Sequence, residues 1–218
     1  MILRYQDPSN RILLLSSVTL TNSEHVAPGN KPTTKTSDLP FSIHAAASLL
    51  YAVVAASGAS AADRHWDPNG TAPGLGGAGV WDTTSTNWSQ SSDGTTGPYV
   101  LWNSAANDTA IFGGTAGAVT IGGAVSTRFL TFQTDGYSLS NGTLTFTGTA
   151  PAITINGADT RVSISSTIIG NAIISDPETS DALIIRGGGT LVLTGNTTTN
   201  GLARIAGAHV RLEGGGQI

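Results

Sequence analysis

From Ala118 onward the chain alternates short runs of β-forming residues with turn residues, and this alternation limits the folds that it can adopt. In several runs, such as Leu144/Phe146 and Ile153/Ile155, apolar residues occupy every second position. A period of two places these side chains on one face of a strand and Thr, Ser or Arg on the other. Most of the runs begin about 8–11 residues apart, and this spacing predicts an all-β sandwich, barrel or solenoid. The runs cover 118–121, 128–132, 143–147, 152–155, 161–164, 172–174, 182–185, 190–193, 202–205 and 209–212.

The turns and the side-chain sizes distinguish a sandwich from a solenoid. Asn141-Gly142 is a signal for a type I′ hairpin, which favours a sandwich. The runs are short, however, and aromatic residues are absent after Phe146. A solenoid accommodates both features, because each coil contacts only its neighbours and glycine suits corners with a positive φ. We therefore predict β-solenoid repeats over 118–218 and an irregular cap, which contains all the tryptophans, over 63–117.

Composition changes abruptly near residue 62. Of the 28 glycines only Gly29 and Gly58 precede Asp63, whereas both lysines, Lys31 and Lys35, lie in that part. The chain therefore joins two different kinds of polypeptide.

The segment just before this boundary has the features of a signal peptide. Its apolar core over 45–56 carries no charge and is shorter than the roughly 20 residues of a membrane-spanning helix. Ala59 and Ala61 supply the small residues of a cleavage site. We therefore predict a signal peptide over 41–62, cleaved between Ala61 and Ala62. The competing interpretation is a buried alanine-rich helix of the folded protein.

Residues 1–40 form a second, less regular part of the leader. They contain four prolines and a single short apolar run over 12–15, which is too little for a domain. Two interpretations compete: a long extension of the signal region, or translation that begins later than Met1. In either case we expect this stretch to be disordered or weakly helical.

Part of the repeat region resembles a known family. The stretch 188–198, GGTLVLTGNTT, is similar to the autotransporter-associated β-strand repeat, and Gly201 matches its closing glycine. Thr198 stands where the repeat has tyrosine, and the spacer before Asn196 is missing. This chain also resembles the N-terminal region of such passengers, at Trp81-Asp82, Asn87-Trp88, Trp102, 108–114 and Val119-Thr120.

The resemblance implies a fold, a role and a location. Such passengers are right-handed β-helices, exported to the bacterial surface or released from it, and typically followed by a C-terminal membrane barrel. The sequence printed here contains no such barrel and stops within a repeat, so we expect an N-terminal fragment of a longer passenger. The expected role is an extended, non-catalytic surface for adhesion or matrix structure, with an extracellular glycan or cell-surface ligand as partner. Without a barrel the location would be periplasmic.

Most chemical functions lack support in the sequence. A net charge of −4 argues against nucleic acid as a partner. The absence of cysteine excludes zinc–thiolate sites, and the four histidines lack zinc-ligand spacing. Residues 74–79 match the pattern G-x-G-x-x-G, but neither a strand before them nor a helix after them is predicted. We expect no cofactor, no metal and no stable membrane span.

The alternative function is a secreted β-helix enzyme that acts on polysaccharides, as a lyase or glycosidase. Its weak candidate residues are Asp176, Glu178 and Asp181, facing Arg161 or Arg186 on adjacent coils, because paired carboxylates can bind cations or hydrolyse glycosides. The simpler interpretation of the acidic cluster is a solvated turn around Pro177.

The tryptophans also have two interpretations. Indole faces can stack on sugars, or the rings can form a small core that closes one end of the solenoid. We favour the core for Trp66, Trp81, Trp88 and Trp102.

Overall fold

The computed structural model describes residues 3–6, 12–15, 61–178 and 180–218, in two compact units, Met1–Val53 and Val54–Ile218. In the first unit β1 (Leu3–Gln6) pairs antiparallel with β2 (Ile12–Leu15). These strands differ from the disordered or weakly helical chain expected over 1–40, because the apolar run of β2 finds a partner strand. The rest of 1–40, and the predicted signal peptide as far as residue 60, lie outside the described residues.

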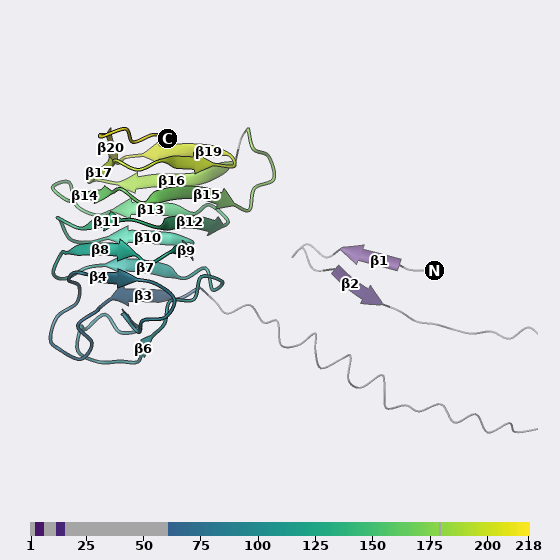
Figure 1. Cartoon of the computed structure of the whole chain (residues 1–218). Helices are drawn as coiled ribbons and strands as arrows, with labels where there is room; N and C mark the ends of the chain where they lie inside the picture. Colours follow the sequence, from purple (N-terminus) through teal and green to yellow (C-terminus); the bar gives the residue numbers. More distant parts are fainter. Residues whose placement is uncertain (1–2, 7–11, 16–60, 179) are drawn as a thin grey trace, which may run out of the picture. The chain divides into compact units, whose positions relative to one another are not determined.

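The second unit is a stack of coils whose strands form three sheets (Figure 1). The first sheet has eight strands in the order β19-β16-β13-β10-β7-β3-β5-β6, the second has six in the order β20-β17-β14-β11-β8-β4, and the third has four in the order β18-β15-β12-β9. The strands of the first sheet are β3 (Asp63–Trp66), β5 (Trp88–Ser89), β6 (Tyr99–Val100), β7 (Thr109–Phe112), β10 (Phe129–Phe132), β13 (Ala152–Ile155), β16 (Asp181–Gly187) and β19 (Leu202–Ala206). Those of the second are β4 (Gly79–Trp81), β8 (Ala118–Ile121), β11 (Ser138–Ser140), β14 (Arg161–Ile164), β17 (Thr190–Leu193) and β20 (His209–Leu212). Those of the third are β9 (Ala124–Thr127), β12 (Thr143–Gly148), β15 (Thr167–Ala172) and β18 (Thr197–Thr199).

Neighbouring coils pair in parallel. In the first sheet Leu130 lies opposite Ala110 of the preceding coil and Ile153 of the following one. The antiparallel strand pairs described in this unit are β3–β5 and β5–β6, both near its N-terminal end. A sandwich is built from antiparallel strands, so the parallel pairing confirms the prediction of a β-solenoid.

The Asn141-Gly142 dipeptide forms a corner and not a hairpin. Both residues have positive φ, 61° and 50°, as a type I′ signal requires. The strands that they join, β11 and β12, belong to different sheets. A Cβ on Gly142 would lie 2.7 Å from the carbonyl oxygen of Ile121 in the preceding coil. Glycine is required here because coils stack closely at this corner.

Alternation of inward and outward side chains builds the core. In β12, Leu144 and Phe146 are buried, whereas Thr143, Thr145 and Thr147 are partly exposed. The same pattern recurs in β10, β11 and β14, so apolar side chains of successive coils stack inside and hydroxyl groups line the outside. The buried stack includes Val119, Ile121, Val125, Leu130, Phe132, Leu139, Leu144, Phe146, Ile153, Ile155, Val162, Ile164, Ile168, Leu183, Ile185, Leu191 and Leu193.

The tryptophans form the N-terminal end of this core. All four indoles are at most 2% exposed, and they pack on one another and on Phe112 of β7. Trp81 and Trp102 make an edge-to-face contact with ring centroids 5.0 Å apart. Because the ring faces are covered by other rings, they form a core and leave no platform for a sugar.

Candidate functional site

The five charged residues predicted as candidates lie in three places. Asp181 and Arg186 lie on β16, and Arg161 begins β14 in the second sheet. Asp176 and Glu178 lie in the segment between β15 and β16.

The ion pairs of these residues involve other partners. Asp181 Oδ2 is 2.7 Å from Arg204 Nη2 on the adjacent strand β19, and Arg161 Nη2 is 3.5 Å from Glu213 Oε1. Arg186 Nε donates a hydrogen bond to Thr154 Oγ1 at 3.1 Å. Within the described ranges, neither Glu178 nor Asp181 forms an ion pair with Arg161 or Arg186. The arrangement that would favour a polysaccharide-acting enzyme is therefore not provided by these contacts.

Asp176 and Glu178 take part in a turn. The backbone N–H of Glu178 donates to Asp176 Oδ1 at 2.8 Å, and that of Ser180 donates to the Asp176 carbonyl at 2.9 Å. This segment is an excursion from the coil between β15 and β16 (Figure 1). It borders a hollow of about 320 Å³ that includes Thr149, Ile173 and Asp181. The carboxylate of Asp176 thus orders its own loop, as the simpler interpretation expects.

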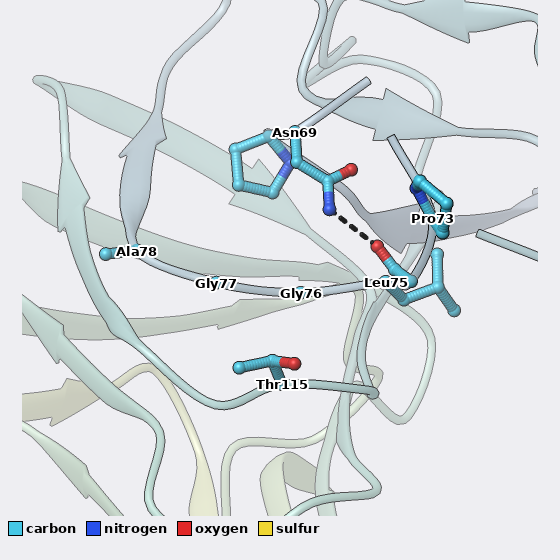
Figure 2. A pocket seen from close by; sticks show the side chains of 9 residues that line it. Asn69, Pro73, Leu75, Gly76, Gly77, Ala78 and Thr115 are labelled. Carbon is cyan, nitrogen blue, oxygen red and sulfur yellow. Dashed lines mark hydrogen bonds between the residues drawn. The ribbon is translucent and has the colours of Figure 1, made fainter. Parts of the chain in front are cut away.

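The glycine-rich stretch over 74–79 borders a second hollow, shown in Figure 2, of about 290 Å³. Asn69 Nδ2 donates to the carbonyl of Gly74 at 2.7 Å and closes the loop. Gly76 has φ +91°, and a Cβ there would meet the Thr115 carbonyl and the Tyr137 hydroxyl. No helix follows the stretch: β4 comes next. Gly76 thus allows close contact with the next coil, and Gly79 allows Trp66 and Pro68 to approach the backbone, so packing explains these two glycines without a dinucleotide.

Several polar groups are buried beneath the cap. Tyr137 Oη donates to the carbonyls of Gly113 and Thr115 at 2.7 and 2.8 Å, and burial raises the pKa of Tyr137 to about 12. Asp67 is fully buried and accepts a hydrogen bond from Tyr99 Oη at 3.1 Å, and burial raises its pKa above the usual value. In the part of the chain that the structure describes, no group of three or more His, Cys, Asp or Glu side chains could hold a metal ion.

The outer surface of the first sheet carries a cluster that sequence reasoning missed. Arg128 lies over the ring of half-buried Phe129, with its guanidinium carbon 4.7 Å from the ring centroid, and the Arg186 guanidinium carbon is 5.9 Å from it. Register places Thr131, Thr154 and Arg186 side by side on three successive coils. We call these residues, Arg128, Phe129, Thr131, Thr154 and Arg186, the Phe129 face. Arg128, Phe129 and Thr131 are close in sequence, but Thr154 of β13 and Arg186 of β16 belong to later coils, and the stacking register brings them beside the other three.

The Phe129 face can donate and accept several hydrogen bonds at once. Arg186 is exposed, and its guanidinium can bind a carboxylate or sulfate with two parallel hydrogen bonds. The threonine hydroxyls beside it can donate to or accept from sugar hydroxyls. A regular ladder of such groups is suited to binding, whereas no activated nucleophile or acid–base pair is present on this face.

Comparison with known proteins gives one informative match. No family model matches the chain, and no solved structure matches it. It is 45% identical over 164 residues to the adhesin BmaC autotransporter of Brucella suis biovar 1 (strain 1330). The match covers 75% of this chain but only 4% of the relative, so the chain spans a small part of that protein.

This match agrees with the architecture of the second unit. The described residues contain strands but no helix that is long and apolar enough to cross a membrane. Parallel coils, an apolar interior and hydroxyl-lined outer faces are the features expected of a passenger. The resemblance to autotransporter passenger-type proteins drawn from the sequence is thereby confirmed.

Proposed function

We propose that this chain is a non-catalytic passenger segment that adheres to a cell-surface or extracellular ligand. The observation that carries the proposal is a rigid parallel solenoid with ordered polar ladders outside, in a chain that is 45% identical to part of an adhesin. A role in the extracellular matrix, or another structural role, is part of the same proposal and uses the same outer surface of the solenoid. A solenoid presents a large area at fixed spacing, which favours multivalent contact with repeated ligands.

The ligand class follows from the Phe129 face. Guanidinium groups beside an aromatic ring and threonine hydroxyls suit a glycan that carries carboxylate or sulfate groups. The segment as a whole is acidic, so local hydrogen bonding and not long-range attraction would select the ligand.

Binding of the full chain to immobilised acidic glycans and to neutral glycans of the same length tests this. We expect Arg186→Ala to lower the affinity for acidic glycans about tenfold, since hydrogen bonds to charged groups contribute about 1.5–3 kcal/mol. Arg161→Ala is the matched control, an exposed arginine on the second sheet. Equal binding by wild type and Arg186→Ala would show that the glycan site is not the Phe129 face. A lack of binding to any cell surface or glycan would contradict adhesion.

The location is part of the same proposal. We infer export by the signal peptide over 41–62, with cleavage between Ala61 and Ala62 and display at the cell surface or release. Its support is the charge-free apolar segment followed by small residues and by an exposed Ala61 at the start of the folded unit. Full-length chain expressed in a Gram-negative host should appear in the exported fraction at the mass of residues 62–218. Retention of the full mass in the cytoplasm would contradict export.

A further inference from the structure

The folded unit begins at a buried carboxylate. The backbone nitrogen of Ala62 donates to Asp108 Oδ1 at 2.8 Å, and Arg64 Nε donates to Asp108 Oδ2 at 2.9 Å. The carbonyl of Ala62 in turn accepts from the backbone N–H of Thr109 at 2.9 Å. Ala62 is therefore held at both its nitrogen and its oxygen, immediately before β3 pairs with β7.

Asp108 is rigidly placed for this contact. Its side chain is only 3% exposed, and that of Arg64 is 20% exposed. The carbonyl of Asp108 accepts a hydrogen bond from Thr127 Oγ1 at 2.9 Å, which fixes the corner before β7 to the next coil. A carboxylate taken out of water in this way favours cationic partners on both oxygens. In the uncleaved chain one partner is a guanidinium and the other is a neutral amide.

Cleavage between Ala61 and Ala62 would change that second partner. Water hydrolyses the peptide bond: the carbonyl carbon of Ala61 gains the hydroxyl, and the nitrogen of Ala62 gains a hydrogen and then a proton at neutral pH. The neutral N–H donor becomes an ammonium group at the same place, 2.8 Å from Asp108 Oδ1. The bond to the carboxylate is charge-assisted before cleavage, and the ammonium adds a direct attraction between opposite charges in a site with little water.

We propose that Asp108 is a binding site for the mature amino terminus of this protein, so that the α-ammonium of Ala62 and the guanidinium of Arg64 share its two carboxylate oxygens. This inference rests on the proposed cleavage before Ala62. Capture of the new terminus locks the first strand of the stack onto the second coil. Processing thereby stabilises the end of the solenoid at which stacking begins.

The sequence makes a direct test available. Both lysines, Lys31 and Lys35, precede the cleavage site, so the α-amino group of Ala62 is the single primary amine of residues 62–218. The full chain is expressed with its leader, and the exported product is purified. Intact mass and N-terminal sequencing identify its first residue. Acetic anhydride labelling over a range of pH then reports the protonation of that one amine.

We expect the exported product to begin at Ala62 and to label about tenfold more slowly near neutral pH when folded than in urea. The midpoint of the labelling profile should lie above the usual value for an α-amino group, about 7.7–8.0. The charged groups beside the amine are Asp108, Arg64 and Asp63, and we expect the carboxylate in direct contact to dominate. Asp108→Asn should return the midpoint to the usual value or below and restore fast labelling.

Two further variants separate capture from simple burial. Arg64→Gln removes the competing cation and should leave labelling at least as slow as in wild type. Asp135→Asn is the matched control, because Asp135 Oδ1 accepts the backbone N–H of Arg161 at 2.7 Å in another corner. It should not change the profile. If Asp108→Asn is not exported as a folded chain, the midpoints of wild type and Arg64→Gln decide the question.

The two proposals fail in different ways. A product that begins elsewhere than Ala62, or that keeps the leader, would overturn the cleavage and the capture with it. A product that begins at Ala62 but shows the same midpoint when folded and in urea would overturn the capture alone. Glycan binding is measured separately and is independent of both results.

Discussion

His65 and Asp67 lie two residues apart at the start of the stack, and both are ionisable groups withdrawn from water. Burial lowers the pKa of His65, with an opposing effect from the charge of Asp63, and burial raises the pKa of Asp67. In both cases the neutral form is favoured, because removing a charge from water costs free energy. Arg64 pairs with Asp108, whereas no cation among the described residues forms an ion pair with Asp67, so the two buried aspartates differ in their surroundings.

The lowered pKa of His65 predicts a loss of stability on mild acidification. The unfolded chain takes up a proton near the ordinary value of 6.5, while the folded chain takes it up only at lower pH. The stability that the folded chain gains from keeping His65 neutral is therefore complete above pH 6.5. It is lost as pH falls through the pKa of His65 in the folded chain. His65→Gln should flatten the pH dependence measured by urea unfolding between about pH 7 and about pH 5.

The control for this experiment is His209→Gln, because His209 is an exposed histidine on β20. It should keep the pH dependence of the wild-type chain. The same slope in His65→Gln and in wild type would show that His65 is not the group responsible.

The strands combine two opposite surfaces within a few residues. In β12, Leu144 is fully buried and the next residue, Thr145, is partly exposed, because successive side chains of a strand point to opposite faces. Register then sets their neighbours: Leu144 lies between Val125 and Ile168, and Thr145 between Ser126 and Ile169. One strand thus contributes to the core and to the outer surface at once.

Substitutions in β12 should separate these two contributions. Leu144→Ala should lower the free energy of unfolding by about 2–5 kcal/mol, since it leaves a cavity between coils. Thr145→Ala, its neighbour on the outer face, should change stability by less than about 0.5 kcal/mol. Urea denaturation of both variants measures the difference. Similar losses for the two would mean that the inward and outward faces of β12 are not distinct.

Stability in a stack of coils is carried between neighbours. Each coil contacts the one before and the one after it, so the unfolding of one coil should destabilise its neighbours before it destabilises the whole stack. The first coil differs from the others because Trp66, Trp81 and Trp88 pack on Phe112 in place of aliphatic side chains. Trp102 packs on Trp81 and Trp88. This cluster lies at the N-terminal end of the stack, where the antiparallel strands β5 and β6 follow β3 in the sheet.

Removal of one indole should therefore loosen one end of the molecule. Trp88→Ala is expected to cost about 3–5 kcal/mol of local stability, as for other large aromatic truncations. Hydrogen exchange should show loss of protection in β3, β5 and β7, while β13 and β16 keep theirs. Trp88→Phe is the control and should retain much of that protection. Uniform loss along the whole stack would indicate a fully cooperative unit and contradict nearest-neighbour stability.

Much of this architecture could be predicted from local pattern. Alternation at positions such as Leu144 and Phe146 depends only on the geometry of a strand, so it identified the inward residues before any contact was known. The concentration of tryptophan before residue 103 likewise predicted a core at one end. Asn141-Gly142 was predicted correctly as a turn but pointed to a hairpin, because positive φ defines a bend and not the sheet to which the next strand belongs.

The amino-acid order alone thus predicts the inward face and many of the strands, such as β10 and β14, since alternation depends only on neighbours in the chain. It does not predict β9 or β18 of the third sheet, whose runs are short and polar. The stacking of the coils decides which residues of different coils lie beside one another, because these residues are separated by whole coils in the sequence. Asp108 meets Ala62 and Arg64, and Arg186 meets Phe129 and Thr154, through the register of parallel strands. Coils differ in length, as the excursion between β15 and β16 shows, so that register cannot be obtained by counting along the sequence.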